Sequence, residues 1–126
     1  MTPDCERISN FIRLWETRDL DAILAVMAPD CIYHNMPWPP LVGHDAIRQG
    51  LAMFVTDAEA IDWQLHHMAE GAEGVVLTER LDRFRIKGSW LEMPVMGIFE
   101  LQDGYITHWR DYFDSAQFQA AMAAIG

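Results

Sequence analysis

Long apolar runs, paired cysteines and basic residues are all scarce in this chain. No stretch approaches the roughly 18 consecutive apolar residues that a membrane-spanning helix needs. The amino terminus shows neither the basic nor the apolar segment of a secretory signal. The two cysteines, Cys5 and Cys31, form no CxxC motif. We therefore expect a cytoplasmic protein with reduced thiols.

The shortage of positive charge excludes further classes. Only 9 Lys and Arg residues stand against 19 Asp and Glu residues, so the net charge is −10. Nucleic-acid binding needs a basic surface, and an anionic membrane face would repel the chain. At 126 residues, the chain is also too short for a TIM barrel or a two-domain dinucleotide enzyme. We predict one domain over residues 1–126 that buries its own core and leaves room for one pocket.

Apolar spacing predicts helices first and strands after them. Residues 4–18 and 44–54 follow the period of amphipathic helices, and Asp19 can cap a short helix between them that Ala28-Pro29-Asp30 ends. The order of elements indicates an α+β protein in which a curved sheet wraps around helices. The strand candidates are Cys31–Met36, a segment after residue 59, Val75–Lys87, Trp90–Leu101 and Tyr105–Phe113. We expect a kink or bulge at Pro94 and Gly97, and a hairpin turn at Asp103-Gly104 before the last strand. A helix that starts at Asp114 or Ser115 closes the chain.

Strand alternation places several polar residues among apolar ones. Arg80 and Asp82 share one face of their strand, Asp111 lies between aromatic residues, and Tyr33 and Asn35 share a face of the first strand. The pattern alone favours ordinary interpretations: a solvated ion pair, an exposed strand residue or cap, and edge-strand residues. The five histidines show no metal-ligand spacing, so we predict no metal site.

Three segments taken together resemble the limonene-1,2-epoxide hydrolase family. They are Tyr33-His34-Asn35-Met36-Pro37-Trp38-Pro39-Pro40, Thr78-Glu79-Arg80-Leu81-Asp82 and Trp109-Arg110-Asp111-Tyr112-Phe113-Asp114. The resemblance covers nearly the whole chain in the same order. It implies a nuclear-transport-factor-like cone: a strongly curved mixed or antiparallel sheet closed by N-terminal helices, with a C-terminal helix. It also implies a homodimer that adds water to epoxides, giving vicinal diols without a cofactor.

The resemblance also implies a role for each polar residue. Asp82 is the acid, Asp111 is the base, Arg80 joins them, and Tyr33 and Asn35 help to hold the attacking water. This set suits epoxide opening, because water must lose a proton while the ring oxygen gains one. Two carboxyl groups and one guanidinium in an apolar pocket favour a state in which one carboxyl keeps its proton.

Substrate, partners and alternative functions complete the prediction. The expected substrate is a small apolar epoxide, cyclic or terpene-derived, and the expected partner is a second copy of the chain, since Ile106 and Tyr112 would otherwise be exposed. A ketosteroid-isomerase-like or polyketide-cyclase-like enzyme of the same fold, or a non-catalytic binding domain, remains the alternative. Position along the chain nominates six residues to line the pocket: Trp38, Leu41, Met53, Phe54, Met93 and Met96.

Overall fold

The computed structural model describes residues 1–125 and confirms the predicted α+β class. Cys5 and Cys31 are both free and buried, and no helix in residues 1–125 combines the length and apolar character needed to cross a membrane. The cytoplasmic location stays a prediction. The elements are α1 (Pro3–Leu14), the 3-10 turn η1 (Trp15–Thr17), α2 (Leu20–Ala25), β1 (Met27–Asn35), β2 (Leu41–Val42), α3 (Gly43–Val55), β3 (Ala60–Glu70), β4 (Val75–Ile86), β5 (Ser89–Gln102), β6 (Tyr105–Tyr112) and α4 (Ser115–Ile125).

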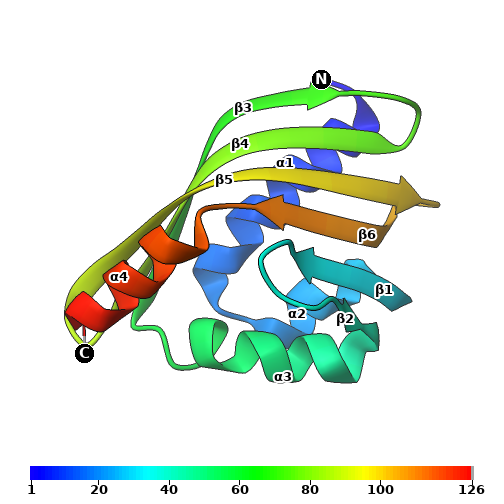
Figure 1. Ribbon diagram of the computed structural model, residues 1–126. Helices are drawn as coiled ribbons and strands as arrows, with labels where there is room; N and C mark the ends of the chain where they lie inside the picture. The colour runs from blue at the N-terminus through cyan, green and yellow to red at the C-terminus, as the bar shows by residue number, and fades with distance from the viewer. Residues whose placement is uncertain (126) are drawn as a thin grey trace.

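One six-stranded mixed sheet organises the molecule, with strand order β2-β1-β6-β5-β4-β3. The pairing of β1 with β6 is parallel, and the other pairings are antiparallel. Figure 1 shows β3, β4 and β5 curving together, with α1 running across the sheet. Helix α3 lies beside β1 and β2, and α4 lies beside β5. A cavity lies between the sheet, α3 and α4.

Thr2 caps α1 by accepting a hydrogen bond from the Cys5 amide at 3.2 Å. This bond satisfies one of the free N–H groups of the first helical turn.

An aromatic core joins the turn that follows α1 to the sheet. The ring of Trp15 in η1 stacks on Trp63 of β3 with centroids 3.9 Å apart, and it meets Trp109 of β6 edge-on at 5.8 Å. These rings form the wall behind the polar residues of β4 and β6.

The first strand differs from its prediction at its start. Ala28-Pro29-Asp30 lies inside β1 instead of ending a helix, because β1 already begins at Met27. A register shift between Met27 and Ile32 interrupts the ladder with β6 and accommodates Pro29, which has no N–H to donate. The short strand β2 was not predicted, because two residues between prolines and a helix carry no alternation signal.

The bulge expected at Pro94 and Gly97 lies elsewhere. The ladder between β4 and β5 is continuous from Ser89 to Glu100, and the register shift occurs between Glu100 and Leu101, opposite β6. This bulge turns Ile106 into the core, where it is fully buried, so the expectation that Ile106 would be exposed is wrong. Tyr112, by contrast, is 48% exposed. The turn at Asp103-Gly104 is confirmed, with φ of 53° and 82° as a two-residue hairpin of type I′ requires.

Candidate active site

A largely apolar cavity of about 630 Å³, including its open mouth, occupies the hollow between the sheet, α3 and α4. Apart from tryptophans, its polar side chains are Tyr33 and Asn35 from β1, Asp82 from β4 and Asp111 from β6. Cavities with a few convergent polar groups in an apolar wall are typical of sites for small molecules. Four of the five predicted catalytic residues therefore line one cavity, and Arg80 lies directly behind them.

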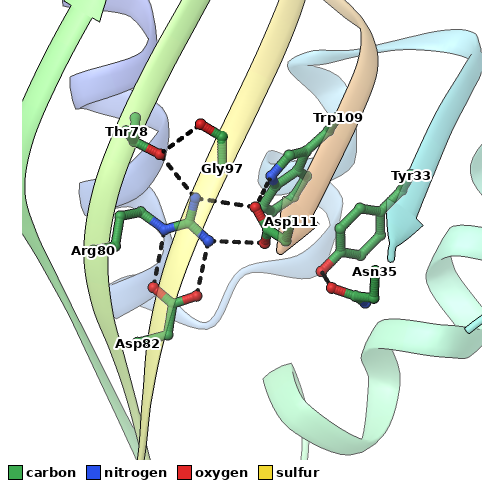
Figure 2. A network of polar contacts seen from close by, with 8 residues as sticks. All are labelled: Tyr33, Asn35, Thr78, Arg80, Asp82, Gly97, Trp109 and Asp111. Atoms are coloured by element: carbon green, nitrogen blue, oxygen red, sulfur yellow. Dashed lines mark hydrogen bonds and ion pairs between the residues drawn. The ribbon is translucent and has the colours of Figure 1, made fainter. Parts of the chain in front are cut away.

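Arg80 connects the two aspartates through a saturated set of hydrogen bonds (Figure 2). Its Nε and Nη2 donate to the two oxygens of Asp82 at 3.0 and 2.9 Å. Its Nη1 and Nη2 donate to the two oxygens of Asp111 at 3.2 and 2.8 Å, and Nη1 also donates to Thr78 Oγ1 at 3.1 Å. All five N–H groups of the guanidinium are thereby used, and two-pronged pairing of this kind fixes both carboxyl groups in orientation.

The pairing of β1 with β6 brings the other two predicted residues to the same place. Asn35 lies opposite Asp111 in the parallel ladder, and Tyr33 lies opposite Trp109. The Tyr33 hydroxyl donates to Asn35 Oδ1 at 3.2 Å, and the Tyr33 ring stacks on Trp109 with centroids 4.3 Å apart. A phenol and an amide are thus held beside the Asp111 carboxyl group (Figure 2).

Burial sets the protonation of the cluster. Arg80, Asp82 and Asp111 are 1%, 5% and 2% exposed. Burial raises the pKa of Asp82 to about 6, with a smaller contribution from the Asp111 charge, against the opposing effect of Arg80. Burial alone would lower the pKa of Arg80, but the two carboxylates outweigh it, so the net shift is upward and the guanidinium stays charged. Burial, helped by Asp111, also raises the pKa of Tyr33, which keeps its hydroxyl proton.

Two residues of the network were missed by sequence reasoning. Trp109 Nε1 donates to Asp111 Oδ1 at 2.7 Å, so the Asp111 carboxyl accepts three N–H hydrogen bonds in all. Thr78 accepts from Arg80 and donates to the Gly97 carbonyl at 3.3 Å. Each precedes a predicted residue by two positions, so strand alternation already placed it on the same face.

The structure places Trp38, Leu41, Phe54 and Met93 in the cavity wall, but it places Met53 and Met96 outside it. Met96 is 50% exposed because Met93 and Val95 face inward, and strand alternation sends the next residue outward. Met53 is 51% exposed because Leu51 and Phe54 define the inward face of α3. The wall also contains nine residues that were not nominated: Trp15, Gly50, Leu51, Trp63, Phe84, Leu91, Val95, Phe113 and Phe118.

Fold and site together define a small-molecule pocket: two buried carboxyl groups share an arginine at the edge of an apolar cavity. The family model of the limonene-1,2-epoxide hydrolase catalytic domain matches residues 3–123. Epoxide hydrolase EphG of Mycobacterium tuberculosis H37Rv is 34% identical over 113 residues, which are 85% of this chain and 70% of that protein. The chain therefore belongs to the limonene-1,2-epoxide hydrolase family, and it is an epoxide hydrolase of that type. That one domain extends over all of residues 1–126 stays a prediction.

Solved structures agree with this assignment. The structure of an M. tuberculosis epoxide hydrolase of the limonene-epoxide-hydrolase-like type has a TM-score of 0.81 and 26% identity, with 96% of this chain and 90% of that chain covered. A hypothetical protein from Catenulispora acidiphila with a ketosteroid-isomerase-like fold has a TM-score of 0.80 at 19% identity, with 98% and 95% covered. The second likeness concerns the fold alone. The chain thus has the cone fold shared by nuclear transport factor 2 and ketosteroid isomerase.

Proposed function

We propose that this enzyme adds water to a small apolar epoxide, cyclic or terpene-derived, with Asp111 as general base and Asp82 as general acid. The observation that carries the proposal is the Arg80 bridge between two buried carboxyl groups, both of which line an otherwise apolar cavity. An apolar wall suits a hydrocarbon substrate, and the paired carboxyl groups supply both proton movements that neutral epoxide opening needs.

The environments of the two aspartates support this division of roles. The raised pKa of Asp82 favours its protonated form, which is the form that a general acid requires. Asp111 accepts hydrogen bonds from both Arg80 and Trp109, an arrangement that suits an ionised carboxylate. Tyr33 and Asn35 lie on the Asp111 side of the cavity, so a water held there lies near the base.

Both aspartates transfer a proton in the proposed reaction. Asp111 accepts a proton from the water as its oxygen bonds to one epoxide carbon. The C–O bond at that carbon breaks, and Asp82 gives its proton to the departing ring oxygen. The product is a vicinal diol, and the proton now lies on Asp111 instead of Asp82. Proton transfer through solvent or across the Arg80-bridged pair restores the starting state.

We propose that the reaction needs no cofactor, since the chain provides its own fixed cation. The guanidinium lies between the two carboxyl groups, where a divalent metal would have to displace it.

Tyr33, Asn35 and the two aspartates position the reactants, and positioning of this kind removes several kcal/mol of barrier, up to about 7–11 kcal/mol in the best cases.

The assignment of reaction and substrate class is tested by incubation with cyclohexene oxide and limonene oxide, with products separated by chromatography. We expect vicinal diols well above the uncatalysed background. A ketone or an allylic alcohol formed without water uptake would instead support the isomerase alternative. If neither epoxide is converted, the proposed substrate class is contradicted.

Activity should fall as pH rises, because the acid must be protonated. Asp82 has its pKa raised to about 6 by burial, so its protonated fraction decreases about tenfold per pH unit above that value. We expect kcat/KM to decline as the pH rises above about 6. The apparent pKa of this decline belongs to the carboxyl pair and not to one residue. Initial rates from pH 5 to pH 9, corrected for uncatalysed opening, provide the measurement. A rate that stays flat to pH 9 would be inconsistent with Asp82 as the acid.

We also propose that the chain forms a homodimer through the outer face of the sheet. Leu77, Met96 and Tyr112 are 37%, 50% and 48% exposed there, and Met96 lies opposite Tyr112 in the β5–β6 ladder. Exposed apolar groups that adjoin in this way mark interaction surfaces. A second copy of the chain would cover them.

Light scattering at micromolar concentration should report twice the 14.5 kDa of one chain. The variant Met96→Glu places a charge in the proposed contact and should shift the mass towards that of one chain. A wild-type mass of 14.5 kDa would rule out the homodimer.

A further inference from the structure

We propose that Gly97 is a positioning residue for the reaction: its lack of a side chain provides the space through which Arg80 reaches Asp111. The inference rests on the proposed function, because it assumes that the Arg80–Asp111 pair takes part in catalysis. Gly97 does not line the cavity, so it would act through the other two residues and not by touching substrate.

The two partners are separated by a whole strand. Arg80 lies on β4 and Asp111 on β6, with β5 between them. Neighbouring strands are about 4.8 Å apart, so the side chains of Arg80 and Asp111 together must bridge about 10 Å between the axes of β4 and β6. Gly97 is the residue of β5 over which they meet, since Gly97 pairs with Thr78 on one side and with Asp111 on the other.

A side chain at Gly97 would occupy the place of the guanidinium. A Cβ there would lie 2.5 Å from Asp111 Oδ1, still closer to Arg80 Nη1, and 3.0 Å from Thr78 Oγ1. Figure 2 shows the guanidinium and the Asp111 carboxyl group meeting in front of β5 at this position. Gly97 is not among the residues with positive φ, so its backbone conformation is open to any residue. Space is therefore what requires glycine here.

The neighbouring groups have little freedom to move aside. Arg80 is fully hydrogen-bonded and 1% exposed, Thr78 is tied to the Gly97 carbonyl, and Asp111 is tied to Trp109. A methyl group would therefore break or rotate the contact between Arg80 Nη1 and Asp111 Oδ1. Interiors packed to this density do not absorb such a change without displacement.

The test is Gly97→Ala. We expect kcat to fall at least ~100-fold, the scale of a misplacement near 1 Å at a reacting group, with KM changed by less than about threefold because the cavity wall is intact. The matched control is Gly71→Ala, which adds the same methyl group in the β3–β4 turn, 3.2 Å from the flexible end of Leu77 and at ordinary contact distance from Val75. This control should keep the wild-type kcat.

A double-mutant cycle with Arg80→Lys separates positioning from general damage. If Gly97 acts through the contact between Arg80 and Asp111, that contact is already lost in Arg80→Lys, so the loss in the double variant should be well below the product of the two single losses. Multiplying losses would overturn the inference, and so would a wild-type kcat for Gly97→Ala when Arg80→Lys is slow. An Arg80→Lys variant with wild-type turnover would instead overturn the proposed function.

Thermal unfolding keeps the inference testable if Gly97→Ala folds poorly. Truncation of Arg80 removes the atom that a Cβ at Gly97 would approach most closely. Gly97→Ala should therefore lower the unfolding midpoint by less in an Arg80→Ala background than in the wild type. An equal decrease in both backgrounds would contradict the proposed role.

Discussion

Replacement of Arg80 by Lys should reduce turnover at least ~100-fold, which is the usual scale for the loss of a positioned electrostatic group. Lysine keeps the positive charge but offers three donors from one nitrogen in place of five donors in a planar fork. It cannot hold both oxygens of Asp82 and both oxygens of Asp111 at once, as Arg80 does. The orientation of acid relative to base is lost, although the net charge of the cluster is unchanged.

Arg83→Lys is the matched control for this experiment. Arg83 also joins two carboxylates, Asp62 and Glu92, but it does so outside the cavity, with 22% of its side chain exposed. Steady-state kinetics on both purified variants, with circular dichroism to verify folding, should show a large loss for Arg80→Lys only. A folded Arg80→Lys enzyme with near wild-type kcat would show that the bridge is not needed.

Asp111→Asn should have a still larger effect, a loss of about 10³-fold or more, since general base catalysis alone contributes about 10²- to 10⁴-fold. The amide has nearly the same shape but cannot accept a proton from water. The substitution also removes a charge that helps to raise the pKa of Asp82, so the acid becomes more ionised beside Arg80. Both proton movements are therefore weakened by a single change.

The expected signature is a fall in kcat with KM nearly unchanged, because the carboxyl group contributes little to the apolar wall. Asp62→Asn serves as the control: it also removes a carboxylate paired with an arginine, but one outside the cavity. Retention of more than about a tenth of wild-type turnover by Asp111→Asn would be too much for an enzyme without its base.

Much of the fold could be predicted because its signals are local. Helical spacing in α1 and α3, alternation in β4 and the left-handed turn at Asp103-Gly104 follow from period and turn chemistry. The start of β1, the strand β2 and the position of the bulge could not. They depend on pairing with β6, a partner far along the chain, and neighbouring sequence does not encode that pairing.

The candidate site divides in the same way. Alternation alone placed Arg80 beside Asp82 and Tyr33 beside Asn35, yet it favoured a solvated ion pair, whereas the structure buries the cluster. The sheet order brings Asp111 of β6 within hydrogen-bonding distance of Arg80 on β4. The resemblance to a family supplied this long-range information. The error at Met96 was avoidable, since a residue three positions from Met93 faces the other side of a strand.

We propose that water attacks the epoxide directly, with Asp111 as base. The alternative is attack by Asp111 itself, which gives an ester that a second base must help to hydrolyse. A histidine commonly provides that base, and no histidine lines the cavity among residues 1–125. His108 lies three residues from Asp111 and contacts Glu100 instead. Tyr33 and Asn35, by contrast, lie beside Asp111, where we propose that they hold a water molecule.

A single turnover in heavy-oxygen water, with enzyme in excess over epoxide, distinguishes the two routes. Mass spectrometry of the diol and of the peptide that contains Asp111 locates the label. Direct attack predicts heavy oxygen in the diol from the first turnover and none in the peptide. An unlabelled diol, with heavy oxygen in the Asp111 carboxyl group, would contradict the account.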